Sequence, residues 1–397
     1  MRPWIPSLVA FSLIATLGGL LAQAPSGRTD AVAKLANRLE TGETKLEYDP
    51  KWGYFPSLLK ELDVPIDSQI LVFSRTSLQQ DKIGPKTPRA LYFNDTVSVG
   101  RVQNGQLFEI TVADPVDGTE FYAIETKKVD KPQILTDRSL CLACHGYTWV
   151  PHTFVATVYP GVDGSPFFMG GDLFHVTDHR TPFEDRWGGW YVTGTHGKMK
   201  HLGNAVARNP YRPVELDTKG TQNVTSLANK IDVTKYLAPT SDLIALMTFE
   251  HQTRAVYYMS ALSAQFRAMG STDMADKKRP TEASLNAAVD NLVSYLTFAD
   301  EAKLTSPVKG VSTFTQTFPQ RGPRDSKGRS LRDFNLKTRL FEYPLSYMVY
   351  TEIFDKMYPQ AQERVYRRLF QELSQPQNRA ALEILRETKP NLPAYWR

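Results

Sequence analysis

The sequence predicts an α+β protein in which a β-rich antiparallel domain precedes an all-helical C-terminal domain. Two patterns along the chain support this fold class. Short segments of alternating apolar and polar residues run to about residue 125, and from Pro239 the apolar residues recur with a period near 3.6. A chain of 397 residues is also long enough for two hydrophobic cores. We expect a β-rich domain over 30–215 and a helical domain over 237–397.

The first elements expected are one helix and a run of strands. The helix spans Asp30–Glu40, where apolar residues recur at helical spacing among charged ones. Asn104-Gly105 and Asp117-Gly118 are typical hairpin-turn pairs, so the strands around them should form an antiparallel meander. The segments predicted as strands are Gln69–Ser74, Ala90–Phe93, Thr96–Val102, Gln106–Val112, Glu120–Glu125, Thr153–Tyr159 and Trp190–Thr195.

The C-terminal half is predicted to be helical. Leu243 to Leu262 and Leu285 to Leu296 carry apolar stripes, and Pro280-Thr281 is a good start for the second helix. Further helices are expected over 347–357, 362–373 and 380–387. The basic stretch from Arg321 to Arg332 indicates a long loop, which is either solvated or a docking surface.

The N-terminus is typical of an export signal. Met1-Arg2-Pro3-Trp4 is a short positive head, an apolar run from Leu8 to Ala22 follows it, and Ala22-Gln23-Ala24 offers a small-x-small cleavage site. Pro25 is disfavoured directly after a cut, so residues 1–24 are either a cleaved signal peptide or a retained N-terminal anchor. We expect a periplasmic or exported protein whose membrane contact is limited to that segment. The formal charge of +5 is mild and gives no case for a nucleic-acid partner.

The only two cysteines stand as Cys141-Leu142-Ala143-Cys144-His145. A Cys-x-x-Cys-His run is typical of covalent c-type haem attachment, in which each thiol binds one vinyl group and the histidine is the proximal iron ligand. A thioredoxin-like site, half of a zinc site and a structural disulfide are the alternatives. Because the motif occurs once, we expect one haem c. The residues from Tyr147 to Asn204 should surround it, because that segment is rich in Gly, Pro, His and aromatic residues.

The sixth iron ligand decides between electron transfer and chemistry at an open iron. Six of the seven histidines fall between residues 145 and 201. His196 is the first candidate because its glycine neighbours would let a porphyrin approach. His179 is second, since Asp178 would orient its imidazole, and Met169 in a glycine-rich run is third.

Other sites receive weaker support. A separate metal site on His175 and His179, or on His196 and His201, is an alternative, although the glycines and Pro182 argue against a continuous helix that would pair them. His251 lies on a helical apolar stripe and is expected to be a buried, hydrogen-bonded histidine.

No hydrolase, zinc-protease or phosphate-loop motif occurs. The charged residues Asp178, Arg180, Asp185 and Arg186 would either move protons on a haem ligand or hold a loop together.

The Cys-x-x-Cys-His-Gly run at Cys141–Gly146 resembles c-type cytochromes in general, but its surroundings do not resemble the small cytochrome c fold. Longer stretches resemble an uncharacterised family of large exported bacterial monohaem proteins with a cytochrome c domain. The region with Tyr159-Pro160 and Gly170-Gly171-Asp172 is similar to PAS-like haem sensor domains. The family stretches are Asp178–Pro182, Arg186–Gly197, Phe249–Gln252 and Arg321–Asp325.

These observations predict a monohaem c-type cytochrome that transfers electrons in the bacterial cell envelope to or from a redox partner protein. Two other functions stay open: a haem enzyme that acts on peroxide or a nitrogen oxide at an open iron, and a PAS-like haem sensor. The spectrum of the haem protein with and without carbon monoxide would separate filled from open iron.

Overall fold

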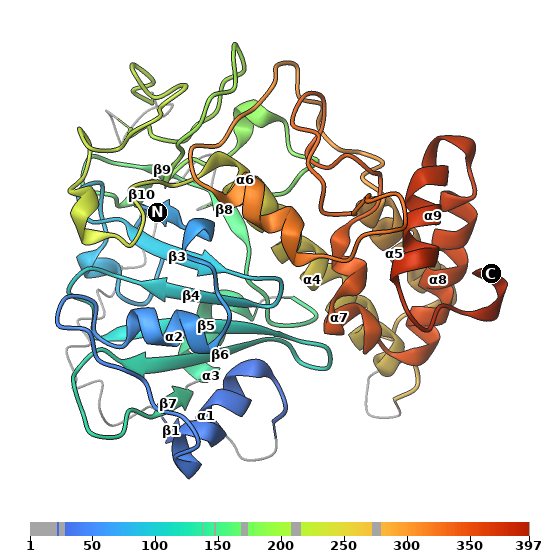
Figure 1. Ribbon diagram of the computed structural model, residues 1–397, viewed down its shortest axis with the longest axis horizontal. Helices are drawn as coiled ribbons and strands as arrows, with labels where there is room; N and C mark the ends of the chain where they lie inside the picture. The colour runs from blue at the N-terminus through green and yellow to red at the C-terminus, as the bar shows by residue number, and fades with distance from the viewer. Residues whose placement is uncertain are drawn as a thin grey trace, which may run out of the picture.

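The computed structural model describes residues 22–23, 28–136, 138–146, 148–167, 174–207, 216–271 and 279–396 (Figure 1). The predicted α+β class is confirmed, because a large antiparallel sheet is followed by a helical C-terminal region. Figure 1 shows the sheet on one side of the molecule and the last helices on the other. No helix in these ranges is long and apolar enough to cross a membrane.

The large sheet has the strand order β1-β7-β6-β5-β4-β3-β2-β12, and every neighbouring pair is antiparallel. The predicted meander is therefore confirmed, with β1 and β7 as strands that the alternation did not predict. Its strands are β1 (Ala22–Gln23), β2 (Ile70–Val72), β3 (Arg89–Phe93), β4 (Val97–Arg101), β5 (Leu107–Asp114), β6 (Gly118–Glu125), β7 (Ile134–Thr136) and β12 (Trp190–Tyr191). Two short hairpin sheets pair β8 (Val155–Thr157) with β11 (His175–Thr177), and β9 (Tyr159–Pro160) with β10 (Pro166–Phe167).

Both predicted hairpin turns are present between the strands of the meander. Asn104 adopts a positive φ of 55° between β4 and β5, and Gly118 one of 88° at the start of β6. Of the predicted export segment, only Ala22 and Gln23 are among the described residues, where they form the edge strand β1.

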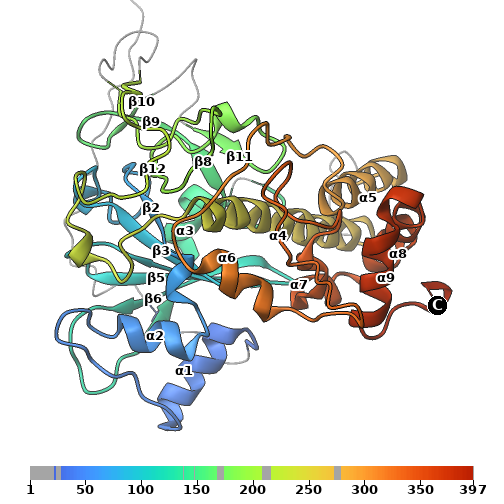
Figure 2. The same ribbon diagram turned by 45° about the horizontal axis from the view of Figure 1, so that its top comes forward.

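The helices surround the sheet on two sides. Their bounds are α1 (Ala31–Thr41), α2 (Phe55–Glu61), α3 (Arg138–His145), α4 (Leu243–Met269), α5 (Glu282–Leu296), α6 (Phe314–Thr317), α7 (Glu352–Asp355), α8 (Pro359–Leu373) and α9 (Arg379–Thr388). Asp30 caps α1, as expected for a helix that starts there. In Figure 2, α1 and α2 lie at one side of the sheet, and α4 runs from the sheet toward α5 and α8.

Each face of the central strands belongs to a different hydrophobic core. Ile70 and Val72 of β2 pack in the core that contains α4 and the other C-terminal helices. Leu71 and Phe73 belong instead to the core that contains α1 and α2. Since successive side chains of a strand point to opposite faces, β2 and β3 join the two halves of the chain directly.

The basic loop is held by ion pairs within the molecule. Its basic side chains form ion pairs both with the sheet region and with the last helix, so this stretch links the two halves of the molecule. Its charges therefore already have partners within the protein. The pairs are Arg321 with Asp63, Arg324 with Asp333, Arg329 with Asp325 and Glu383, Lys327 with Glu383, and Arg332 with Asp95.

The N-terminus of α4 is fixed by one buried carboxylate. Asp242 accepts hydrogen bonds from Ile244 N at 2.8 Å and Ala245 N at 3.2 Å through Oδ1. Through Oδ2 it accepts from Val311 N at 2.7 Å and Ser312 N at 2.8 Å. Gly310 is required beside it, because a Cβ there would lie 2.5 Å from Oδ2.

We expect Asp242→Asn to lower the free energy of unfolding by about 2 kcal/mol, because an amide nitrogen would face two backbone N–H donors and leave them unpaired. Urea unfolding followed by circular dichroism measures this. Thr281→Ala, which removes the exposed cap of α5, is the matched control and should lower it by about 1 kcal/mol. Equal losses for the two variants would contradict the role given to Asp242.

Candidate functional site

The Cys-x-x-Cys-His motif lies on α3, a helix of eight residues that contacts β6. Cys141, Cys144 and His145 stand at positions i, i+3 and i+4, so they share one side of the helix. Cys144 is exposed, Cys141 and His145 are half-buried, and neither thiol forms a disulfide. Two thiols and one imidazole are therefore presented together close to the protein surface.

The imidazole of His145 has a defined tautomer. Its Nδ1 lies 2.8 Å from the carbonyl oxygen of His152. A carbonyl only accepts hydrogen bonds, so Nδ1 carries the proton and donates it, and Nε2 keeps its lone pair. Burial lowers the pKa of His145, which further favours the neutral ring. A neutral imidazole with Nδ1 bonded to a carbonyl and Nε2 open is the state in which histidine binds a metal ion.

An aromatic surface surrounds this imidazole. The ring of His145 lies 5.0 Å from that of Phe121 and 5.6 Å from that of Phe154. Phe154 in turn stacks on Phe174 at 5.2 Å. Phe174 is 42% exposed and Trp149, four residues after His145, is 46% exposed. Large exposed aromatic side chains beside the motif are suited to contact a flat apolar group.

The aromatic residues expected around the haem are Trp149, Phe154, Phe167, Phe168, Phe174, Phe183, Trp187, Trp190 and Tyr191. The structure divides this set between the motif and the hydrophobic cores. Trp149, Phe154 and Phe174 lie at or near the motif, as expected. The other described members are in the hydrophobic cores instead: Phe183, Trp187, Trp190 and Tyr191. The side chains of Phe167 and Phe168 lie outside the described residues.

The loop after α3 is held by both halves of the molecule. His152 N donates to His145 O at 3.2 Å, and Thr119 N of β6 donates to Pro151 O at 2.8 Å. The His152 side chain is buried, with Nδ1 3.1 Å from Thr148 Oγ1. Its ring packs against that of Tyr257 on α4, with centroids 4.5 Å apart.

His196, the first candidate for the distal ligand, has both ring nitrogens engaged. Nδ1 lies 2.8 Å from Met199 O, and Nε2 accepts from Asn223 N at 3.0 Å. Its ring is fully buried against Phe183 and His201. Iron ligation would require one of these hydrogen bonds to break, so the structure disfavours His196 for this role.

His179, the second candidate, forms a buried pair with His251. Their Nδ1 atoms are 2.8 Å apart, and His251 Nε2 lies 2.7 Å from Ser346 Oγ. The expectation that His251 is buried and hydrogen-bonded is confirmed. Nε2 of His179 is buried without a partner among the described residues, and its ring packs against Tyr295 and Phe298. The ring contacts of His179 thus do not include the aromatic surface around His145.

Met169, the third candidate, lies outside the described residues, so its role stays a prediction.

No group of three or more His, Cys, Asp or Glu side chains in the described ranges is placed to hold a metal ion. This gives no support for a separate metal site on His175 and His179 or on His196 and His201, nor for a zinc site at the cysteines. A thioredoxin-like site lacks its expected βαβ context, because the named strands pair antiparallel throughout.

The charged residues near His179 hold loops together. Arg186 forms an ion pair with Glu250 of α4 at 3.1 Å, with the two side chains 3% and 0% exposed. Arg180 binds Asp178 at 2.7 Å. Glu250 was not among the predicted functional residues, although a Glu-His-Gln run inside an apolar helix is a signal for buried polar contacts. These pairs match the structural alternative given for Asp178, Arg180 and Arg186.

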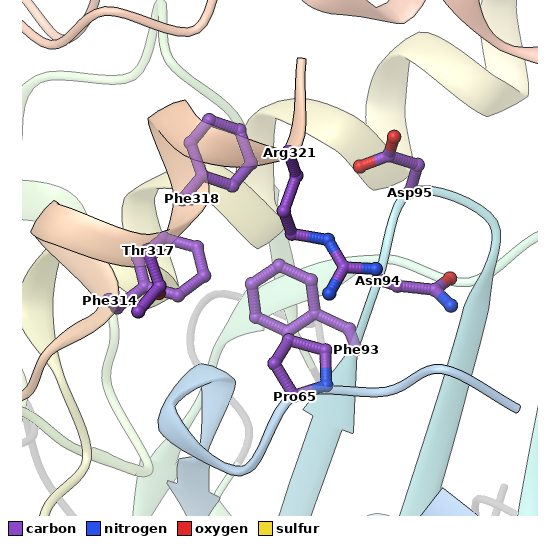
Figure 3. Close-up of a pocket in the computed structure, with 8 residues that line it drawn as sticks. All are labelled: Pro65, Phe93, Asn94, Asp95, Phe314, Thr317, Phe318 and Arg321. Atoms are coloured by element: carbon purple, nitrogen blue, oxygen red, sulfur yellow. The ribbon is translucent and has the colours of Figure 1, made fainter. Parts of the chain in front are cut away.

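Two small hollows have no residue of the motif in their lining. Figure 3 shows one between β3 and α6, where Phe93, Phe314, Phe318, Arg321 and Asp95 are among the lining residues. Its volume is about 10 Å³, and that of a second hollow lined mainly by residues of β4, β5 and α4 is about 20 Å³. Each has room for about one water molecule, so neither is a site for an organic ligand.

Comparisons of the chain with models of known protein families, with curated proteins and with solved structures find no match. The chemistry of the residues on α3 and around it therefore carries the functional assignment.

Proposed function

We propose that this protein is a monohaem c-type cytochrome that transfers electrons in the bacterial cell envelope. Cys141 and Cys144 would hold one haem c by thioether bonds, and His145 would be its proximal ligand. The observation that supports this most directly is the hydrogen bond from His145 Nδ1 to the His152 carbonyl at 2.8 Å. It leaves the lone pair of Nε2 available on a residue that shares one side of α3 with the two cysteines, which fits the donor set that haem c requires.

The surroundings of the motif fit a flat apolar group. Phe121 and Phe154 pack on His145, while Phe174, which stacks on Phe154, and Trp149, four residues further along the chain, leave aromatic area open to solvent. When bound, the haem would supply a one-electron carrier whose iron alternates between the ferric and ferrous states. The exposed position of Cys144 would keep one edge of this group near the surface, where an electron donor or acceptor protein can approach.

The test of covalent attachment is direct. We expect the full chain, expressed in a bacterium that matures c-type cytochromes, to carry the mass of one haem after denaturation. The double variant Cys141→Ser/Cys144→Ser should lose it completely, because no thiol remains to form a thioether. His145→Ala should keep the covalent haem but lose the low-spin spectrum, since only the axial ligand is removed. A wild-type chain without covalent haem would overturn the proposed function.

The distal ligand separates electron transfer from the two other functions. We expect sharp low-spin bands that carbon monoxide does not change, because a filled sixth position suits electron transfer. Met169→Ala should then make the spectrum sensitive to carbon monoxide, whereas His196→Ala and His179→Ala should not, because both side chains are engaged elsewhere. A wild-type spectrum that shifts with carbon monoxide would indicate an open iron and favour a haem enzyme or a PAS-like sensor.

A further inference from the structure

The carbonyl that binds His145 belongs to a loop that the C-terminal half holds in place. His152 supplies this carbonyl, and its buried side chain points to α4. There its ring packs on Tyr257 with centroids 4.5 Å apart and planes tilted by 38°. The position of the carbonyl therefore depends on a contact with a helix that begins almost a hundred residues later.

Tyr257 is itself fixed by its neighbours on and near α4. The guanidinium of Arg254 lies 5.0 Å from the centre of the Tyr257 ring and 3.7 Å from Asp178. Asp178 is held in turn by Arg180 at 2.7 Å. The contact with His152 thus comes from a braced side chain that loses little conformational entropy when it packs there.

The other support of the loop comes from the sheet. Thr119 N of β6 donates to Pro151 O at 2.8 Å, directly before His152. This bond fixes the backbone on one side, but it does not determine the rotation of the next peptide, which carries the His152 carbonyl. The side chain of His152 is restrained locally by Thr148 Oγ1 at 3.1 Å and by the Phe154 ring at 5.5 Å, and the ring contact with Tyr257 is the restraint that the helical half adds.

We propose that Tyr257 is a positioning residue for the His145 ligand, through which the helical half tunes the redox potential of the haem. This inference rests on the proposed haem site. A hydrogen bond from Nδ1 makes the imidazole a stronger electron donor, which stabilises the ferric state. Loosening the His152 carbonyl should therefore favour the ferrous state.

Tyr257→Ala in the full haem protein is the test. At the wild-type midpoint potential, we expect the ratio of reduced to oxidised protein to rise at least about threefold. This is smaller than the effect of about tenfold or more that is typical when a residue hydrogen-bonded directly to a metal ligand is lost. Tyr257→Phe should restore the wild-type ratio, because only the ring contacts His152. Tyr395→Ala, which removes a half-buried tyrosine that packs on Phe370, is the control and should leave the ratio unchanged.

A second measurement does not depend on electron transfer. Amide hydrogen exchange at His152 N, which donates to His145 O, should speed up in Tyr257→Ala and not in Tyr257→Phe. If Tyr257→Ala does not fold, Tyr257→Leu replaces it, since leucine keeps apolar volume without the ring.

Three outcomes would overturn the inference while the proposed function stands. They are an unchanged ratio in Tyr257→Ala, an equal shift in Tyr257→Phe, and an equal shift in Tyr395→Ala, each in protein whose covalent haem is confirmed by mass. Absence of covalent haem from the wild-type chain would overturn both proposals together.

Discussion

Lowering the pH from 7 to 5 will reduce the free energy of unfolding steeply, because the fold buries neutral histidines. Burial lowers the pKa of both His201 and His251 to about 3. In the unfolded chain the same groups take up a proton near pH 6.5. Below that pH the unfolded state binds more protons than the folded state, so each histidine removes about 1.4 kcal/mol of stability per pH unit.

The direction of this effect and its pH range follow from the lowered pKa values of the two histidines. The stabilisation is fully present above pH 6.5 and is lost as the pH falls toward 3, so acid and not base should unfold the protein. Urea unfolding at pH 7, 6 and 5 measures the slope. The variant His201→Phe isolates one group, because His201 lies among Phe183, Trp187 and His196 with Nδ1 unpaired in the described structure.

We expect the slope of His201→Phe to be smaller than that of the wild type by about 1.4 kcal/mol per pH unit. The comparison of slopes is independent of any change in stability at pH 7. Identical slopes for the two proteins would show that His201 is protonated in the folded state as readily as in the unfolded one, contrary to its burial.

Replacing Glu250 by glutamine will cause the second large loss of folding stability. Its carboxylate is fully buried on α4 and pairs with Arg186, whose own side chain is 3% exposed. Burial raises the pKa of Glu250, and the guanidinium opposes that rise. Glu250→Gln removes the negative charge and leaves a buried guanidinium without its counter-charge. We expect the free energy of unfolding to fall by about 3 kcal/mol, the lower end for broken buried pairs, because the amide oxygen still accepts a hydrogen bond.

The matched control makes the same change in an exposed pair. Glu282 on α5 binds Arg364 at 2.7 Å, but its side chain is 56% exposed. Glu282→Gln should leave the urea midpoint close to that of the wild type, because exposed ion pairs contribute little. If Glu250→Gln behaved like Glu282→Gln, the buried pair would not be the link between α4 and the loop before β12 that the contacts indicate.

The elements that follow a simple period were predictable from sequence. The meander strands, α1, α4 and α5 are found close to their predicted positions, because each carries an apolar face that must be buried. The helices α2, α3 and α6 and the short strands β1, β7, β10 and β11 were not predicted. α3 has only eight residues, and β7 only three, so neither is long enough to show a period.

The site was predictable in part for a related reason. The spacing of Cys141, Cys144 and His145 follows from local chemistry, but the His152 carbonyl and Tyr257 are brought to it by tertiary packing. The glycines near His196 suggested room for a porphyrin. In the structure, a Cβ at Gly197 would lie 2.8 Å from Ser306 Cβ, and a Cβ at Gly194 would lie 2.7 Å from Lys309 O. These glycines admit a neighbouring segment of the same chain, which sequence alone does not reveal.

The division of β2 and β3 between two cores has a consequence for how such a chain changes in evolution. Leu91 and Phe93 face one core, while Ala90 and Tyr92 between them face the other. A substitution in these strands therefore affects packing against the C-terminal helices at even-numbered positions of β2 and odd-numbered positions of β3, and packing against the N-terminal helices at the other positions. The helical half could not be gained, lost or exchanged as an independent domain unless the residues of β2 and β3 that pack against it changed at the same time.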